Sequence, residues 1–583
     1  MLKTPNFIKT NACPMLVILL ILSGFALQSQ NSIHIEEQKY YNTHGIEKDN
    51  RENSKVFKNE FRGLELNQQV FGYHPYWIGN EYQSYPWNLL SDLCYFSYEI
   101  NSSTGEAVST HSFLTAAVID TALHYGTKVH LCATLFSGHA SFFSNQAAMD
   151  TFTQRMVELV KQRKIHGINL DLEAVPSSQK DAMSSFVIAF SQKVKSEIPD
   201  CIISMATPSV NWNNTFDLSA MEASVDLFMV MAYDYYWNGS SVAGPVAPLY
   251  PMENSYKYSA VQTIQYYLGL GLPASKILLG VPYYGRSWPV YDALAPSATR
   301  GSGSALKYRS IKANTTYYNW ESLRFEPNSR HTYYSYDLNG WNHCFTETYT
   351  SLGQKYDQVL GYGLAGIGIW ALGYDDGYPE LWEQIASKFG TNASASCSDT
   401  LFDNGGPAYV SKAENSHSFI LKPSNAGPLK LMVHDFSSDA GTLNIYDGEN
   451  SSAELKASLP GSSTPMEINL GSGMAFLDFV FTTASSATNY RLSWQCGSSG
   501  IVTVTGKQIE LFVIPGTSCI QIKGLIGTGC FIELFDLSGR RFLKQALPFQ
   551  RECTVEIPVQ LKGAFIARIQ GNGFVQSRKL NHF

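Results

Sequence analysis

The chain has 583 residues, which exceeds the ~100–200 residues of one typical domain and predicts two to four domains. Its net charge of −7 argues against a nucleic-acid or anionic-membrane partner. Charged residues make up only 16% of the chain, below an average of ~25%, whereas aromatic residues reach 13%. Aromatic rings serve core packing first, and their flat faces also suit the apolar faces of sugar rings.

The N-terminal residues resemble an export signal. Lys3 and Lys9 precede an apolar run, Met15–Leu22, which is too short to span a bilayer because spanning takes ~20 residues. We predict that residues 1–29 are removed and that the mature chain is secreted or attached to the cell surface, without a transmembrane segment. Residues 30–64 are polar and lack sustained periodicity, so they are predicted to be a linker or N-terminal extension.

From residue 66 to residue 392 the chain alternates short apolar runs with helical patterns. Strands that alternate with helices pair in parallel, since a parallel connection needs a crossover. Eight such strands within this length predict an α/β fold, a (β/α)₈ TIM barrel. The predicted strands are Val70–Tyr76, Leu93–Ile100, Lys128–Phe136, Ile165–Glu173, Ile202–Thr207, Leu227–Tyr233, Ile277–Tyr283 and Gly366–Leu372.

The fourth strand carries the strongest chemical pattern. Its residues alternate, so that Asn169, Asp171 and Glu173 share one face. Two carboxylates confined in one enclosed site repel each other, and one of them then keeps its proton near neutral pH. A protonated acid beside an ionised one is what cleavage of a glycosidic bond requires. Considered alone, the pattern fits a strand with a solvated polar face equally well.

Polar and aromatic side chains also end two other predicted strands. Tyr233 and Asp234 follow the sixth strand, and Trp370 lies near the end of the eighth. Active sites of TIM barrels lie at the C-terminal ends of the strands. A single solvated strand does not account for three such strand ends, so the pattern favours one shared site.

Four segments in order resemble glycoside hydrolase family 18. Asn169-x-Asp171-x-Glu173 is similar to the family's DxxDxDxE signature, and Met231–Asp234 to its Met-x-Tyr-Asp. Gly280–Trp288 resembles its G-[LIV]-P-x-Y-G-R segment, and Gly366–Trp370 its last strand with a floor tryptophan. The resemblance covers residues 66–392.

The resemblance implies a chitinase-like enzyme that cleaves β-1,4 bonds next to N-acetylglucosamine, with retention and without metal or cofactor. In that family the substrate's own acetamide group replaces the enzyme nucleophile. Glu173 would be the acid and base, Asp171 would orient the acetamide, and Tyr233 would donate to it. Asn169 and Asp234 would support them, and the substrate-binding residues would be Trp370, Met231, Tyr73, Tyr284 and Arg286.

The chain departs from the family pattern at three places. Asn169 replaces the middle acid, and we expect its amide to hydrogen-bond Asp171. His166 replaces the first acid and, being out of phase, is expected to point away from the cleft. Residues 132–135 lack the usual Ser-x-Gly-Gly of the third strand. The Asn-x-Asp-x-Glu form resembles a branch with cell-wall and spore glucosaminidases as well as chitinases.

Other functions therefore stay open. In one alternative, the chain is still an enzyme, but its substrate is peptidoglycan or the core of an N-linked glycan instead of chitin. A chitin-binding lectin without catalysis is a further alternative, although family members that only bind have usually lost the terminal glutamate, which is present here as Glu173.

The rest of the chain is expected to form accessory domains. The aromatic region at about residues 289–358 is predicted to be a small subdomain inserted in the barrel. Two β-sandwich domains should follow. Residues 397–498 resemble a CUB-like sandwich, and Cys397 and Cys496 bracket it and can close it as a disulfide. Residues 505–583 resemble a C-terminal sorting domain recognised by the type IX secretion machinery.

Overall fold

The structure is a computed structural model. It describes residues 32–45, 65–256, 258–319, 321–390, 397–409, 415–423, 427–463, 465–482, 488–496, 510–513, 519–523, 531–536, 541–546, 552–558, 561, 563–571 and 574–582. The predicted export signal, residues 1–29, lies outside the described residues.

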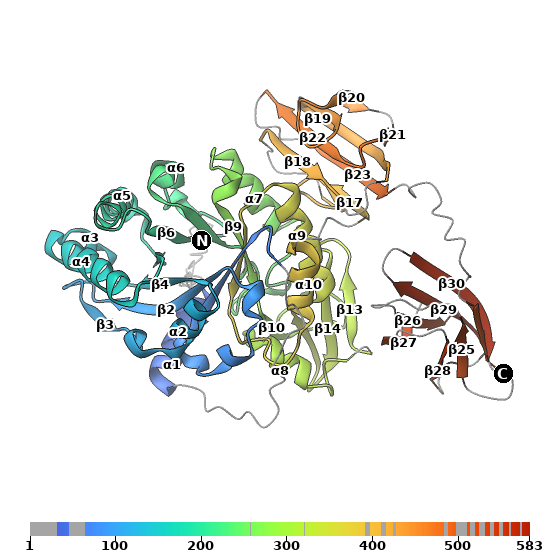
Figure 1. The fold of residues 1–583 in the computed structure, drawn as a ribbon, viewed down its shortest axis with the longest axis horizontal. Coiled ribbons are helices and arrows are strands. Elements are labelled where there is room, and N and C mark those ends of the chain that lie inside the picture. Colours follow the sequence, from blue (N-terminus) through green and yellow to red (C-terminus); the bar gives the residue numbers. More distant parts are fainter. Residues whose placement is uncertain are drawn as a thin grey trace, which may run out of the picture. The chain divides into compact units, whose positions relative to one another are not determined.

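Eight parallel strands close into a barrel (Figure 1), which confirms the predicted fold. The first strand pairs in parallel with both the second and the last, so the barrel sheet closes on itself. The strands of the barrel are β1 (Gln69–Pro75), β2 (Asp92–Ile100), β4 (Lys128–Leu135), β5 (Gly167–Leu172), β6 (Ile202–Pro208), β7 (Leu227–Met231), β9 (Ile277–Pro282) and β16 (Gly366–Trp370). β3 (Ala107–Ser109) extends β2 in an antiparallel hairpin.

Helices cover the outside of the barrel, which explains why its strands are buried on both faces. They are α2 (Ala117–His124), α3 (His139–Phe143), α4 (Gln146–Arg163), α5 (Lys180–Glu197), α6 (Leu218–Met221), α7 (Ala260–Gly269), α9 (Tyr349–Gly361) and α10 (Glu380–Phe389). On α4 the residues Phe152, Met156 and Val160 recur every four positions and are buried. Each such side chain stabilises the fold by about 1.5–3 kcal/mol.

An antiparallel sheet is inserted between β9 and the last barrel strand. It is formed by β10 (Tyr284–Pro289), β12 (Ser304–Lys307), β13 (Leu323–Glu326), β14 (His331–Asp337) and β15 (Trp341–Phe345), with α8 (Tyr308–Ala313) between β12 and β13. The two-residue strands β8 (Val242–Ala243) and β11 (Ser297–Ala298) pair beside it. The sheet begins before the predicted bound at residue 289, and α9 lies partly inside the predicted range although it leads back into the barrel.

Residues 397–496 form a separate layer of antiparallel strands joined by a disulfide between Cys397 and Cys496, as the sequence allowed. The strands are β17 (Ser398–Phe402), β18 (His417–Leu421), β19 (Leu429–Asp447), β20 (Glu454–Ser463), β21 (Met466–Leu470), β22 (Ala475–Phe481) and β23 (Asn489–Cys496). Cys94 and Cys132 are buried free thiols.

Residues 498–583 form a second compact unit with its own core, which includes Ile532, Leu534 and Phe565. Its strands are β24 (Glu510–Val513), β25 (Cys519–Lys523), β26 (Phe531–Asp536), β27 (Arg541–Ala546), β28 (Glu552–Glu556), β29 (Gly563–Gly571) and β30 (Phe574–His582). Across the described part of the chain, the helices are all too short or too polar to cross a membrane.

The first described segment is a helix, α1 (Ile33–His44). Ser32 caps its N-terminus by accepting a hydrogen bond from the Ile35 amide. Ile33 and His34 are fully buried although they precede the first barrel strand by more than thirty residues. Residues 33–44 of the predicted linker or N-terminal extension therefore form a helix, which the lack of periodicity in the sequence did not predict.

Candidate functional site

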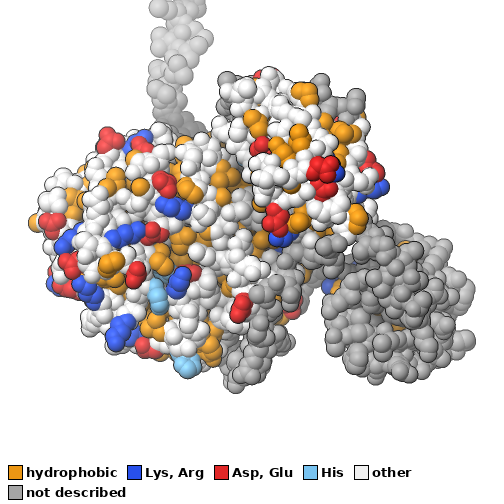
Figure 2. Space-filling view, turned by 45° about the horizontal axis from the view of Figure 1, so that its top comes forward, with side chains coloured by type: hydrophobic (Ala, Val, Ile, Leu, Met, Phe, Trp, Pro, Cys, Tyr) orange, Lys and Arg blue, Asp and Glu red, His pale blue; other side chains and the backbone are white. Residues whose placement is uncertain are grey.

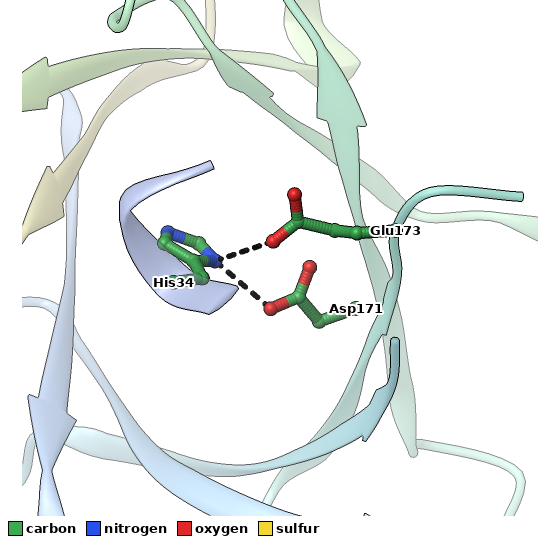
Figure 3. A group of neighbouring side chains, drawn as sticks. All are labelled: His34, Asp171 and Glu173. Atoms are coloured by element: carbon green, nitrogen blue, oxygen red, sulfur yellow. Dashed lines mark hydrogen bonds and ion pairs between the residues drawn. The ribbon is translucent and has the colours of Figure 1, made fainter. Parts of the chain in front are cut away.

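The C-terminal ends of three barrel strands bring the predicted catalytic side chains together. Asp171 lies on β5, with Glu173 directly after that strand, while Tyr233 follows β7 and Trp370 ends β16. All four are buried, and Glu173 retains the largest exposure, 7%. Figure 3 shows Asp171 and Glu173 pointing into the ring of barrel strands from the same side of β5.

Two glycines allow the site strands to approach their neighbours. A side chain at Gly167 would place its Cβ 2.3 Å from the ring of His130 and 2.6 Å from the carbonyl of Ile202. A side chain at Gly280 would meet the Val230 carbonyl at 2.3 Å and the Tyr233 ring at 2.9 Å. Because both contacts include backbone atoms, any larger residue would displace β5 or Tyr233.

The environment of Glu173 favours its protonated form. Burial raises the pKa of Glu173, and the negative charge of Asp171 raises that pKa further. Asp171 is fully buried, and its Oδ1 has no hydrogen-bond partner among the described residues. The pair therefore provides a proton donor beside a carboxylate with one free acceptor atom.

Asn169 does not bond Asp171, contrary to the prediction. Its Oδ1 accepts a hydrogen bond from the Tyr73 hydroxyl at 3.0 Å, and its Nδ2 donates to Ser204 Oγ at 2.9 Å. The reason is the strand geometry, since the side chain of Asn169 is directed to β1 and β6, which carry these partners. Asn169 thus ties three strands together beneath the acids.

Asp234 joins the two predicted binding residues of the inserted sheet. Its Oδ1 accepts from the Tyr284 hydroxyl at 2.7 Å and from Arg286 Nη2 at 3.4 Å. Asp234 has a left-handed backbone with φ 55°, and Ala174, next to Glu173, has the same φ. Such conformations are uncommon for residues with a Cβ and gather at functional sites.

The side chain of His34 on α1 enters this site. Its Nδ1 lies 2.9 Å from Asp171 Oδ2 and 3.3 Å from Glu173 Oε1, and its Nε2 lies 2.8 Å from the Tyr233 hydroxyl. Figure 3 shows the His34 ring facing both carboxylates. The imidazole stacks on Trp370 with ring centroids 3.6 Å apart and an interplanar angle of 29°. His34 is fully buried in this position.

Neighbouring residues of α1 contact the rest of the site. Ser32 Oγ donates to Glu173 Oε1 at 2.8 Å, and the Ile33 amide donates to Asp234 Oδ2 at 2.8 Å. Glu37 Oε2 accepts from Trp370 Nε1 at 3.0 Å and from the Tyr374 hydroxyl at 2.7 Å. Glu36 Oε2 lies 3.4 Å from Arg286 Nη1. Tyr41 stacks on Trp77 with ring centroids 4.8 Å apart.

The protonation of His34 follows from these contacts. Burial by itself lowers the pKa of His34, but the charges and hydrogen bonds of Asp171 and Glu173 outweigh it and raise the pKa to about 10. The three side chains place ligand atoms within 4.8 Å of one another, a spacing that also suits a metal ion. Since Nδ1, the atom that would ligate a metal, already donates to Asp171, we interpret the group as an ion pair.

The remaining predicted residues lie around this centre. Tyr73 is buried, and its ring centroid lies 5.6 Å from that of His34. Met231 is buried at the end of β7, beside Pro208 of β6. His166 is exposed, and its Nδ1 accepts from the Val129 amide, which agrees with the predicted structural role.

Sequence analysis missed the residues that α1 contributes, as well as Tyr374. A weak signal was present, because Ser32 followed by Glu36 and Glu37 has the pattern of a helix N-terminus with an acidic first turn. That local pattern does not identify the distant residues that the helix contacts, so it does not indicate that the helix lies at the C-terminal end of the barrel.

The fold and this group of side chains define a closed (β/α)₈ barrel with an acidic site at the C-terminal ends of its strands. The family model described as Glycosyl hydrolases family 18 matches residues 69–375. The chain therefore belongs to glycoside hydrolase family 18, as the four motifs predicted.

Curated relatives and a solved structure match the same region. A putative sporulation-specific glycosylase of Bacillus subtilis is 24% identical, covering 39% of this chain and 52% of its own length. A class V chitinase of Arabidopsis thaliana is 27% identical over 41% of this chain and 66% of its own length. The chain thus spans about half to two thirds of these relatives' length.

The solved structure is that of a GH18 chitinase from Cycas revoluta in complex with (GlcNAc)4. It covers 55% of this chain and 98% of its own chain, with 20% identity and a TM-score of 0.50. This likeness confirms the barrel fold.

Proposed function

We propose that this chain is a glycosidase that cleaves β-1,4 bonds next to N-acetylglucosamine in a polysaccharide, with retention of configuration. The observation that carries the proposal is the buried pair on β5, in which burial and the charge of Asp171 raise the pKa of Glu173. Membership of glycoside hydrolase family 18 and the similarity to a class V chitinase support it.

In the first step Glu173 donates its proton to the glycosidic oxygen while the acetamide oxygen of the sugar attacks the anomeric carbon. The bond to the leaving sugar breaks as this internal bond forms, so no enzyme nucleophile is needed. Asp171 accepts the acetamide N–H and balances the positive charge that develops. Tyr233 donates to the acetamide oxygen, and Trp370 supports the ring of the sugar.

In the second step the Glu173 carboxylate accepts a proton from water. The hydroxide so formed attacks the anomeric carbon from the side of the departed sugar, and the internal bond to the acetamide oxygen breaks. The two displacements together give retention, and Glu173 ends the cycle protonated as it began.

The role of Asn169 follows from its observed contacts. Its bonds to Tyr73 and Ser204 hold β5 in place without titrating. We expect Asn169→Asp to place a third carboxylate beside Asp171 and thereby shift the pH optimum of sugar cleavage. A pH–rate profile of both proteins measures this, with Asn169→Ser as a control that changes the contacts but not the charge. An unchanged optimum in Asn169→Asp would mean that the position is purely structural.

Chitin is the first candidate substrate and peptidoglycan the second, the latter because the chain also resembles a sporulation-specific glycosylase. The test is to incubate the purified chain, both intact and cut within residues 46–64 so that α1 can leave Asp171 and Glu173, with colloidal chitin, peptidoglycan and a high-mannose glycopeptide and to identify the products by mass spectrometry. Release of N-acetylglucosamine oligomers supports the proposal. Binding of chitin oligomers without any released sugar would support the lectin alternative instead.

The charge pattern of the surface supports a polysaccharide substrate. On the face drawn in Figure 2, acidic and basic side chains are interspersed over the barrel, which suits a neutral polymer better than a polyanion. The proposal includes export through residues 1–29, with residues 505–583 as a type IX sorting domain. Residues 397–498 would act as a CUB-like binding or spacer module.

A further inference from the structure

We propose that residues 32–44 are a built-in inhibitor that occupies the sugar-binding position of the barrel and must leave before a polysaccharide can enter. This inference rests on the proposed function for the identity of the excluded ligand. It requires α1 to compete with the substrate for the same side chains.

The contacts of α1 engage every group that the proposed reaction uses. Glu173 is the proposed proton donor, and its Oε1 accepts a hydrogen bond from Ser32 and lies 3.3 Å from His34 Nδ1. The only Asp171 oxygen with a partner among the described residues is also held by His34. With Glu173 7% exposed and Asp171 fully buried, no glycosidic oxygen can reach the acid while the helix is in place.

His34 resembles the reacting part of the proposed substrate in shape and charge. Its flat ring lies over Trp370, where the sugar ring would lie. One ring nitrogen faces Asp171 and the other faces Tyr233, the two residues that would hold the acetamide group. As an imidazolium it carries the positive charge that Asp171 would stabilise during catalysis.

The helix is suited to reversible binding. It has 12 residues, a length at which an isolated helix is marginal in water, so it depends on its contacts with the barrel. Several of these are polar, including the pairs of Glu36 with Arg286 and of Glu37 with Tyr374. The covalent connection through residues 46–64 makes binding intramolecular, which corresponds to an effective concentration on the order of millimolar for a short linker. Cutting that connection removes this advantage.

The predicted export signal ends before Ser32, so its removal would leave the inhibitor attached.

The experiment uses the full chain with a recognition sequence for a specific protease placed within residues 46–64. Hydrolysis of a fluorogenic N-acetylglucosamine oligomer is measured before and after cutting, at decreasing protein concentration. We expect the uncut protein to be slow at every concentration and the cut protein to become about tenfold faster or more on dilution, as the segment dissociates. A synthetic peptide of residues 32–45 should restore inhibition. Equal rates for cut and uncut protein would overturn the inference.

A second readout separates this inference from the proposed function. Binding of chitotetraose is measured by calorimetry with the cut and uncut forms of the Glu173→Gln chain. If the cut form binds the sugar at least tenfold more tightly, the helix is an inhibitor even where no substrate is hydrolysed, and only the proposed reaction fails. Equal sugar affinity of the two forms would show that α1 does not occupy the sugar position.

Matched substitutions on the same helix test the contact itself in the uncut chain. His34→Ala removes a buried side chain that is bonded to the Asp171 carboxylate, so we expect the rate or the sugar affinity to rise about tenfold or more. Lys39→Ala changes an exposed residue of α1 and should leave both values within about twofold of the parent. An equal response of the two variants would contradict the assignment of His34.

Discussion

Glu173→Gln is expected to lower the rate of sugar cleavage by ~10²-fold or more in the cut, diluted protein, because it removes the proton donor. Glutamine has the same size and still accepts the hydrogen bond that Ser32 donates to Glu173. The loss would therefore reflect lost acid catalysis rather than altered packing. The measurement is the steady-state rate on an N-acetylglucosamine oligomer at saturating substrate.

The control is Glu197→Gln, which changes an exposed carboxylate on α5 that pairs with Lys161 and Lys193. Its rate should match that of the parent, since surface ion pairs of this kind contribute little. Substantial activity in Glu173→Gln would contradict the assignment of Glu173 as the acid. A product of inverted configuration from the parent would contradict the substrate-assisted mechanism.

Binding of the peptide of residues 32–45 to the cut protein is expected to weaken by about 10²-fold from about pH 7.5 to about pH 9.5. The ordinary pKa of a free histidine is 6.5, and in the complex that of His34 is raised to about 10. Because the bound form holds the proton more tightly, its contribution is complete below pH 6.5 and is lost as the pH rises to about 10. Between these two pH values binding of the peptide takes up one proton, so its affinity falls nearly tenfold for each pH unit of increase.

Glu37 and Tyr233 also lie near His34, and both titrate outside this window. Burial raises the pKa of Glu37 to about 7, although the hydrogen bond from Tyr374 opposes the shift. Glu37 therefore takes up a proton on binding mainly below pH 7 and contributes little to the pH dependence between 7.5 and 9.5. Burial holds the pKa of Tyr233 well above its usual value. The charged and titratable groups near the imidazole are Asp171, Glu173, Tyr233, Asp234, Arg286, Glu36 and Glu37.

A peptide with His34→Gln provides the control, since glutamine does not titrate. Its affinity should be lower than that of the parent peptide at pH 7.5 and nearly constant across the window. Fluorescence anisotropy of labelled peptides measures both affinities. The same pH slope for the two peptides would show that a group on the barrel, not His34, carries the dependence.

Local sequence patterns predicted the barrel and most of the site. Each barrel strand is a short apolar run between helical patterns, and a parallel sheet covered on both faces requires such runs. The strand ends placed Asp171, Glu173, Tyr233 and Trp370 at one mouth, and the structure brings them together. These residues could be predicted from short stretches of sequence, because the alternation of side chains along a strand decides which of them face the interior of the barrel.

Contacts between distant segments were decided only by the tertiary structure. Asn169 is only two residues from Asp171, yet its side-chain amide hydrogen-bonds Tyr73 and Ser204. These two residues lie on the strands β1 and β6, at the same height in the barrel as Asn169. The helix at residues 33–44 is buried mainly at its N-terminal end and has a polar sequence, since many of its contacts there are with the carboxylates and hydroxyls of the site. Hydrophobic periodicity indicates burial against apolar surfaces, so it carries no signal for a segment buried by ion pairs and hydrogen bonds. The sequence by itself therefore predicted which two acids lie side by side at the end of β5, and only the tertiary structure decided that His34 lies against them.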